Sequence, residues 1–237
     1  MICSPQWLKN DATSSPPQSD VAALVVFTIG HSTRPREDFI RLLKAHRVQR
    51  VIDVRAIPRS RHNPQFNRDQ LSPALHRAGI HYRHMPGLGG LRHARRDSTN
   101  RGWRNASFRG YADYMQTSTF RESLDRCIEL ANRERVVLMC AEAVPWRCHR
   151  SLIADALLVR GIEAREITSG VRTRPHSLTS WARVNGTQIT YPAAGAPSRQ
   201  SGVADSDQDG HSPKRRCLLK EEAPRRRRLS TVGHAVP

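Results

Sequence analysis

Residues 24–55 read LVVFTIGHSTRPREDFIRLLKAHRVQRVIDVR and decide the fold class. The apolar, partly β-branched run at 24–29 ends at Gly30 and is typical of a strand that is buried on both faces. Over residues 35–48, a proline at the start and apolar residues at helical spacing predict an amphipathic helix. The run at 51–55 predicts a second strand. This β-α-β opening favours a parallel sheet.

The rest of the chain continues this alternation of helices and strands. Apolar periodicity predicts helices near 71–78, 120–131 and 148–160, and strands near 80–85, 136–140 and 164–167. Residues 91–107 are rich in arginine and poor in large apolar residues, which predicts a long loop. We therefore expect an α/β fold, a single domain with a mostly parallel sheet of about five strands flanked by helices.

The two ends of the chain differ in composition from this central part. Residues 1–20 are polar and rich in Pro and Ser, and residues 193–237 combine small residues with charge runs. Neither segment has an apolar face, so we expect disordered tails, the second one basic, around an α/β domain at 21–192. No apolar run approaches the roughly 18 residues of a membrane span, and the N-terminus does not resemble a secretory signal. We expect a cytoplasmic protein with no membrane contact.

The charge balance bears on possible partners. The chain has 39 Lys and Arg residues against 21 Asp and Glu residues, a formal net charge of +18. Such a field attracts nucleic acid, nucleotides and other polyanions without specifying which. Most of the basic residues are arginines, a skew that the base composition of a genome can also produce. The five cysteines are odd in number and irregularly spaced, so we expect no structural disulfides.

Polar residues stand at the ends of three predicted strands. His31 follows the first strand, Asp53 and Arg55 end the second, and Cys140 and Glu142 follow the fourth. Ligands of parallel sheets bind beyond the carboxyl ends of the strands, so we expect one cleft to gather these side chains. The structural alternative is that Asp53 pairs with Arg55 and that His31 caps the next helix.

Residues 140–150 read CAEAVPWRCHR and join a buried strand to a helix through a loop with several reactive groups. Cys148 and His149 lie at the predicted helix start, where free amide groups stabilise a thiolate or bind a phosphate beside Arg150. Cys148 also lies on the packed side of that helix, and Cys140 continues a buried strand. Both are therefore also consistent with inert core thiols.

The spacing in this loop argues against familiar cofactor sites. Seven residues separate the two cysteines and a histidine directly follows the second, which matches no common zinc pattern. The loop lacks the glycines of a phosphate-binding nest. The Gly-Leu-Gly-Gly run at 87–90 lacks the strand-turn-helix setting and the lysine of a nucleotide-binding loop. We expect neither a metal site nor a recognised cofactor.

Seven short blocks stand in order along the chain: Thr28–Ser32, Asp53–Arg55, Pro58–Ser60, Leu88–Gly90, Gly110–Met115, Cys140–Glu142 and Cys148–Arg150. Together they resemble the signature blocks of the domain-of-unknown-function 488 family. The resemblance extends from residue 24 to about residue 192. It implies an α/β fold and a polar site built from these blocks, and it brings no settled activity.

The leading hypothesis is an enzyme that acts on a phosphate-bearing substrate, either a nucleotide or a nucleic acid. The candidates are Arg55, Arg59, Arg61, His149 and Arg150 for binding, and His31, Asp53 and Glu142 for proton transfer. One alternative is a non-catalytic nucleic-acid-binding module that uses the basic surface. The other is thiol chemistry through Cys140 and Cys148 as catalytic residues. The oligomeric state stays open.

Overall fold

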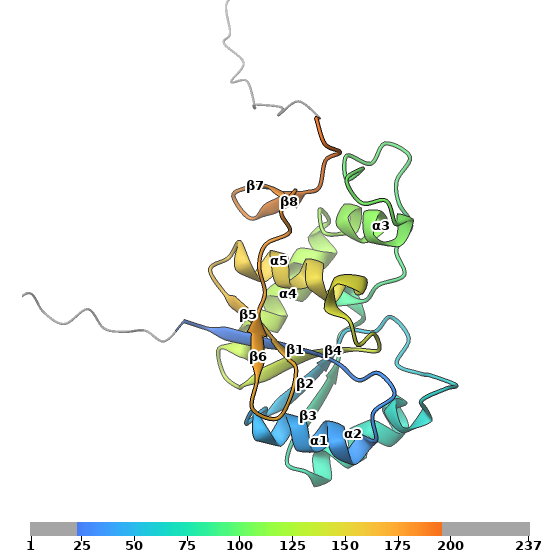
Figure 1. The fold of residues 1–237 in the computed structure, drawn as a ribbon, viewed down its shortest axis with the longest axis vertical. Coiled ribbons are helices and arrows are strands. Elements are labelled where there is room, and N and C mark those ends of the chain that lie inside the picture. Colours follow the sequence, from blue (N-terminus) through green and yellow to red (C-terminus); the bar gives the residue numbers. More distant parts are fainter. Residues whose placement is uncertain (1–22, 196–237) are drawn as a thin grey trace, which may run out of the picture. The chain divides into compact units, whose positions relative to one another are not determined.

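The computed structural model describes residues 23–195 (Figure 1). The predicted disorder of residues 1–20 and of nearly all of residues 193–237 falls outside this range. Within residues 23–195, no helix combines the length and the apolar character that crossing a membrane requires.

Six strands form one sheet in the order β3-β2-β4-β1-β5-β6. They are β1 (Val25–Gly30), β2 (Arg50–Asp53), β3 (His81–His84), β4 (Val136–Cys140), β5 (Glu163–Ile167) and β6 (Thr173–Pro175). The first five strands run parallel, and β6 pairs antiparallel with β5. The predicted α/β fold with a mostly parallel sheet of about five strands is confirmed.

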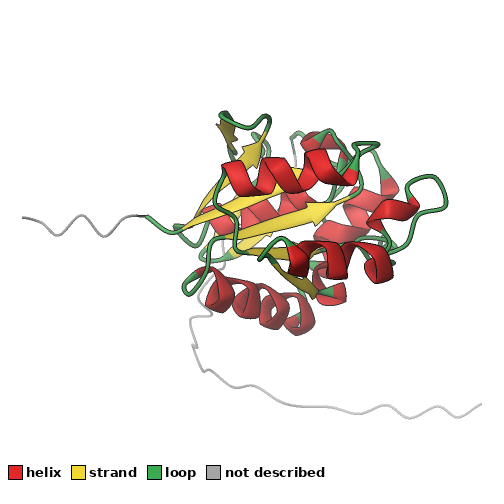
Figure 2. Cartoon of the chain, turned by 90° about the horizontal axis from the view of Figure 1, so that it is seen from below, coloured by secondary structure: helices red, strands yellow, loops and turns green. Residues whose placement is uncertain are grey.

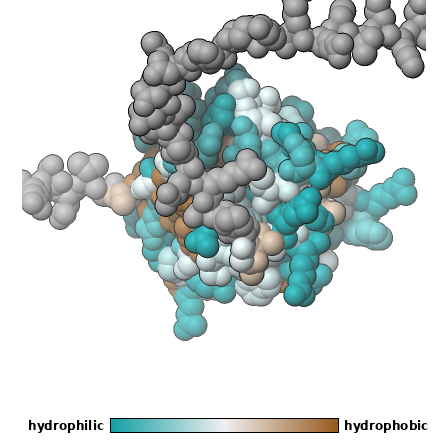
Figure 3. Space-filling view, turned by 90° about the horizontal axis from the view of Figure 1, so that it is seen from above, coloured by the Kyte–Doolittle hydropathy of each residue, from teal (hydrophilic) through white to brown (hydrophobic). Residues whose placement is uncertain are grey.

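Helices cover both faces of the sheet (Figure 2). On one face lie α1 (Arg36–Ala45) and α2 (Arg68–Arg77), and on the other α3 (Ala106–Tyr114), α4 (Ser118–Ala131) and α5 (Arg150–Leu158). Three 3-10 turns, η1 (Pro64–Phe66), η2 (Pro86–Leu88) and η3 (Pro145–Arg147), lie in the connections. The apolar sides of the helices are buried against the sheet, and hydrophilic side chains dominate the face seen in Figure 3.

Several elements were not predicted from the sequence. The helix α3 follows the arginine-rich loop because the Asn105 side chain accepts the backbone N–H groups of Ser107 and Phe108 and so caps it. A small hairpin of β7 (Arg183–Asn185) and β8 (Gln188–Thr190) turns at Gly186, whose φ of +57° suits glycine. The edge strand β6 is also new. The three strands are short and six of their nine residues are exposed, whereas α3 buries Gly110, Tyr111, Ala112 and Asp113.

The alternation of side chains along β4 decides where its last residue points. Val137 and Met139 pack with α1 and α2, whereas Leu138 and Cys140 pack in the cluster that contains α4 and α5. At the end of the strand, Cys140 is in register with Gly30 of the neighbouring β1. The Cys140 thiol therefore lies at the carboxyl edge of the sheet, on the face of α5.

Candidate functional site

A pocket of about 470 Å³ opens at the carboxyl ends of β2 and β4. Its wall combines the loop after β2, the loop after β3, helix α3 and the loop between β4 and α5. Candidates from the sequence that line it are Arg55, Arg59, Cys140, Glu142, Cys148 and His149. His31, Asp53, Arg61 and Arg150 are not part of its lining.

The two cysteines of this pocket lie against each other. The Sγ atoms of Cys140 and Cys148 are 2.7 Å apart, only about 0.7 Å more than the length of a disulfide bond. Both side chains are buried among the residues of one core cluster and both reach the pocket wall. The third cysteine of the described region, Cys127, lies in the core and away from the pocket lining. Cys140 and Cys148 therefore form a dithiol site.

Arg150 fixes the loop around this dithiol. Its Nη1 donates to the Cys140 sulfur at 2.7 Å and to the Glu142 carbonyl at 2.6 Å, and its Nη2 donates to the Ala143 carbonyl at 3.1 Å. The same guanidinium pairs with Glu166 at 2.9 Å and is fully buried. All of its donors point to protein atoms, so the side chain is engaged within the fold.

The environment separates the two thiols in acidity. Burial opposes ionisation of Cys140, but its hydrogen bond with Cys148 and the charge of Arg150 together lower its pKa. The hydrogen bond with Cys140 and burial raise the pKa of Cys148 well above its ordinary value. The sequence reasoning offered a stabilised thiolate at Cys148 as one alternative, on the expectation of a helix start there. In the structure α5 begins at Arg150, and the thiolate is favoured at Cys140.

His149 lies beside the second thiol. Its Nε2 is 3.0 Å from the Val54 carbonyl oxygen, and its Nδ1 is 3.7 Å from the Cys148 sulfur. A carbonyl only accepts, so Nε2 carries the hydrogen and the Nδ1 lone pair faces the thiol. Burial lowers the pKa of His149 to about 4, which keeps the ring neutral at neutral pH. Gly90 leaves room for the ring, since a Cβ there would lie 3.0 Å from Nδ1.

The loop after β4 passes close over the end of β1. A Cβ on Gly30 would lie 1.9 Å from the Glu142 carbonyl oxygen, so only glycine fits. Backbone hydrogen bonds from His31 to Cys140 and from Ser32 to Ala141 tie the two chain segments together. This close approach holds the Glu142 carbonyl where Arg150 binds it.

Asp53, Arg55 and His31 form a second, buried polar group, of which only Arg55 reaches the pocket wall. Two contacts of 2.9 and 2.6 Å join the Arg55 guanidinium to the Asp53 carboxylate, which also accepts from Tyr82. The His31 Nδ1 donates to the Ser32 carbonyl, and its Nε2 accepts from Arg55 at 3.3 Å. Burial lowers the pKa of His31 to about 4. The two residues Asp53 and Arg55 pair with each other, as the structural alternative expected.

His31 does not cap the following helix, which begins after Pro35 without a side-chain cap. The remaining candidates lie nearer the surface. Glu142 is half-buried and its carboxylate accepts the backbone N–H of Val144. Arg59 and Arg61 are exposed, and only Arg59 lines the pocket.

A comparison with protein-family models matches residues 35–157 to the domain of unknown function DUF488. The chain belongs to the DUF488 family. No curated protein and no solved structure matches it. The matched segment of this DUF488 chain includes the dithiol, Arg150, His149, Asp53 and Arg55, and it starts four residues after His31.

The DUF488 pocket also contains Ser107, Phe108 and Tyr111 of α3. Tyr111 belongs to the Gly110–Met115 block, whereas Ser107 and Phe108 lie outside every block and candidate that the sequence supplied. The Tyr111 hydroxyl donates to the Leu88 carbonyl, and its ring centroid lies 5.0 Å from that of His149. The apolar spacing of Phe108, Tyr111, Ala112 and Met115 is helical and was the available signal. The arginine-rich residues 91–107, which come just before this spacing, predicted a loop instead.

The electrostatics of the DUF488 site do not form an anion nest around Cys140. Between Cys140 and α5, the carbonyls of Glu142 and Ala143 point inward to Arg150. A phosphate-binding loop instead directs N–H groups inward. Within residues 23–195, no group of three or more His, Cys, Asp or Glu side chains is arranged to hold a metal ion.

Proposed function

We propose that this DUF488 chain is a thiol-dependent oxidoreductase in which Cys140 and Cys148 cycle between a dithiol and a disulfide. The observation that carries the proposal is the 2.7 Å contact between the two sulfurs at the pocket wall, with Arg150 bound to Cys140. A pair of thiols that differ in acidity is the usual arrangement of an attacking and a resolving cysteine. Of the three hypotheses from the sequence, thiol chemistry through Cys140 and Cys148 therefore becomes the first choice.

The first step is attack on a disulfide substrate. The Cys140 thiolate forms a bond to one sulfur of the substrate, the substrate S–S bond breaks, and one thiolate leaves with the bonding electrons and takes a proton from solvent. Arg150 assists because its charge favours the thiolate over the thiol before attack. The product of this step is a mixed disulfide between Cys140 and the remaining half of the substrate.

The second step is resolution by Cys148. As the Cys148 sulfur bonds to that of Cys140, the Cys148 proton passes through His149 Nδ1 to the second substrate thiolate, which leaves as a thiol. The protein dithiol is oxidised to a disulfide and the substrate disulfide is reduced to two thiols. An external thiol completes the cycle by reversing both steps.

The experiment is a redox titration of the full chain. The protein is equilibrated in mixtures of reduced and oxidised dithiothreitol, trapped by alkylation and analysed by peptide mass spectrometry. We expect one reversible transition that joins Cys140 to Cys148, with Cys127 unchanged throughout. If both thiols are alkylated as slowly as Cys127 and no joined peptide forms, the proposal is wrong.

A phosphate-bearing substrate, the leading hypothesis from the sequence, is a second candidate. Arg55 and Arg150 do not favour it, because both guanidinium groups are bound by carboxylates within the fold. The support comes from Arg59 and Arg147, which line the pocket and make no side-chain hydrogen bond or ion pair with residues 23–195. Turnover of a phosphate ester that survives replacement of both cysteines by serine would favour this candidate over the dithiol.

The alternative of a nucleic-acid-binding module without catalysis is supported by the net charge of +18 alone. Binding of this kind weakens steeply with salt because it depends on the release of counterions. A salt titration of single-stranded DNA binding between roughly 50 and 200 mM tests it, and replacement of Cys140 should leave such binding unchanged.

A further inference from the structure

Two arginines at the mouth of the cysteine pocket take no part in the dithiol mechanism. Arg59 follows β2 and Arg147 ends η3, and both are exposed and line the pocket. Neither donates a side-chain hydrogen bond or joins an ion pair with the rest of residues 23–195. An unpaired guanidinium presents a planar set of donors that matches carboxylate and phosphate oxygens.

The other charged residues of the pocket do not offset the positive charges of Arg59 and Arg147. Arg55 is matched by Asp53, and Glu142 is the one carboxylate among the lining residues. The Glu142 carboxylate accepts a backbone N–H at 3.1 Å. The mouth therefore presents more positive than negative charge to an entering molecule, which favours an anion.

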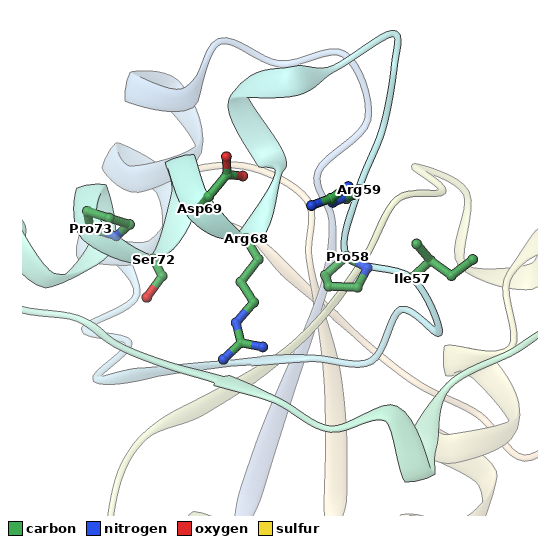
Figure 4. A pocket seen from close by; sticks show the side chains of 7 residues that line it. All are labelled: Ile57, Pro58, Arg59, Arg68, Asp69, Ser72 and Pro73. Carbon is green, nitrogen blue, oxygen red and sulfur yellow. The ribbon is translucent and has the colours of Figure 1, made fainter.

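A second cavity of about 550 Å³ lies on the same loop, and Ile57 and Arg59 line both cavities. Figure 4 shows its wall, with Arg59 on the loop after β2 and Arg68 on the first turn of α2. Asp69 also lines it and supplies the one carboxylate there. Arg59 therefore borders both cavities, and Arg68 adds a further basic residue to the second.

The mouth also exposes apolar surface. Ile57 is 62 % exposed and Leu91 is 75 % exposed, and both line the cysteine pocket. Leu91 holds a φ of +61°, a conformation that residues with a side chain rarely adopt. Apolar side chains held at a pocket mouth suit contact with the organic part of a substrate.

We propose that the pocket takes a low-molecular-weight disulfide whose organic part carries carboxylate or phosphate groups, held by Arg59 and Arg147 while its sulfur meets Cys140. This inference rests on the dithiol function proposed above. It adds the substrate class and the two residues that select it.

The experiment compares three probes that share a reactive disulfide bond. Bis(2-hydroxyethyl) disulfide is neutral, glutathione disulfide carries carboxylates and coenzyme A disulfide carries phosphates. For each probe, the rate of Cys140–Cys148 disulfide formation is measured in the wild-type chain and in the double variant Arg59→Gln/Arg147→Gln. The matched control is Arg133→Gln, which removes one charge before the start of β4, at the opposite end of the sheet from Cys140.

We expect the double variant to lower the rate with an anionic probe by about 3- to 10-fold and to leave the neutral probe unchanged. The difference should shrink at about 0.5 M salt. A loss confined to coenzyme A disulfide identifies phosphate as the recognised group, and a loss confined to glutathione disulfide identifies carboxylate.

The proposed selectivity is wrong if the double variant loses rate equally with neutral and anionic probes, or if Arg133→Gln loses as much rate as the double variant. Either result leaves the dithiol function standing. Failure of all three probes to oxidise the wild-type pair is a different result, because it removes the dithiol function and this inference together.

Discussion

The Nδ1 atom of His149 lies 3.7 Å from the sulfur of Cys148, and the Val54 carbonyl fixes the hydrogen of that ring on Nε2. A neutral imidazole with its lone pair toward a thiol is an acceptor for the thiol proton. In the proposed cycle this contact makes Cys148 reactive at the moment of resolution, although its pKa is raised in the resting dithiol.

Replacing His149 should slow resolution more than attack. In His149→Gln, we expect the mixed disulfide on Cys140 to accumulate and the second step to slow by about 100-fold, the lower range for loss of a general base. Quenched-flow sampling with mass spectrometry separates the two steps. The control is His76→Gln on the exposed last turn of α2, which should behave as wild type. Equal slowing of both steps would show that the ring only supports the fold.

The three described cysteines should differ in alkylation rate. With iodoacetamide at pH 7, we expect Cys140 to react first, Cys148 later and Cys127 last, because the thiolate is the nucleophile. Burial raises the pKa of Cys127 to about 12, which makes it an internal reference. Peptide mass spectrometry over time gives the order. Reaction of Cys148 before Cys140 would reverse the assignment of attacking and resolving thiols.

The contributions of Arg150 and Glu166 to the free energy of unfolding should depend strongly on each other. Arg150→Met leaves the Glu166 carboxylate with little solvent and without its 2.9 Å partner, so we expect the free energy of unfolding to fall by about 3–5 kcal/mol. Adding Glu166→Gln should recover part of that loss. Urea denaturation of both single variants and the double variant measures the coupling. A loss below about 1 kcal/mol in Arg150→Met would contradict the buried pair.

Acidification should destabilise the fold between pH 6.5 and pH 4. Burial lowers the pKa values of His31 and His149 to about 4, so in this window the unfolded chain binds more protons than the folded one. Stability is therefore fully present above pH 6.5 and decreases as the pH falls, with a slope of up to about 1.4 kcal/mol per pH unit for each histidine. Denaturation curves at several pH values give this slope. In His149→Gln the slope should be smaller, and an unchanged slope would mean that this ring does not contribute.

The glycine at the end of β1 should not tolerate a side chain. In Gly30→Ala, the new Cβ would occupy the position of the Glu142 carbonyl, so the loop that Arg150 holds must move. We expect a loss of about 1–3 kcal/mol in stability and slower alkylation of Cys140. Gly170→Ala is the control, because a Cβ there meets only the Ala45 side chain at 3.9 Å. Wild-type alkylation of Cys140 in Gly30→Ala would show that the loop geometry does not set its reactivity.

The sequence by itself determined the main layers of the fold. The apolar runs at 24–29 and 136–140 identify β1 and β4 because a strand buried on both faces carries its signal in consecutive residues. The helical spacing near residues 120–131 likewise identifies α4. The short, polar elements β6, β7 and β8 carry no such signal, since they form through pairing with neighbours that are distant or exposed.

The tertiary structure alone decided which polar residues act together. The sequence placed Asp53, Arg55 and Cys140 at strand ends and Cys148 at a helix start, but their partners depend on how the loops fold back. The turn of residues 141–147 brings Cys148 to Cys140, a contact that the sequence did not predict, and the burial of Arg55 decides for its pairing with Asp53, which the sequence left as an alternative. Sequence spacing does not encode such contacts, because the direction of a loop is set by distant packing such as the approach of Glu142 to Gly30.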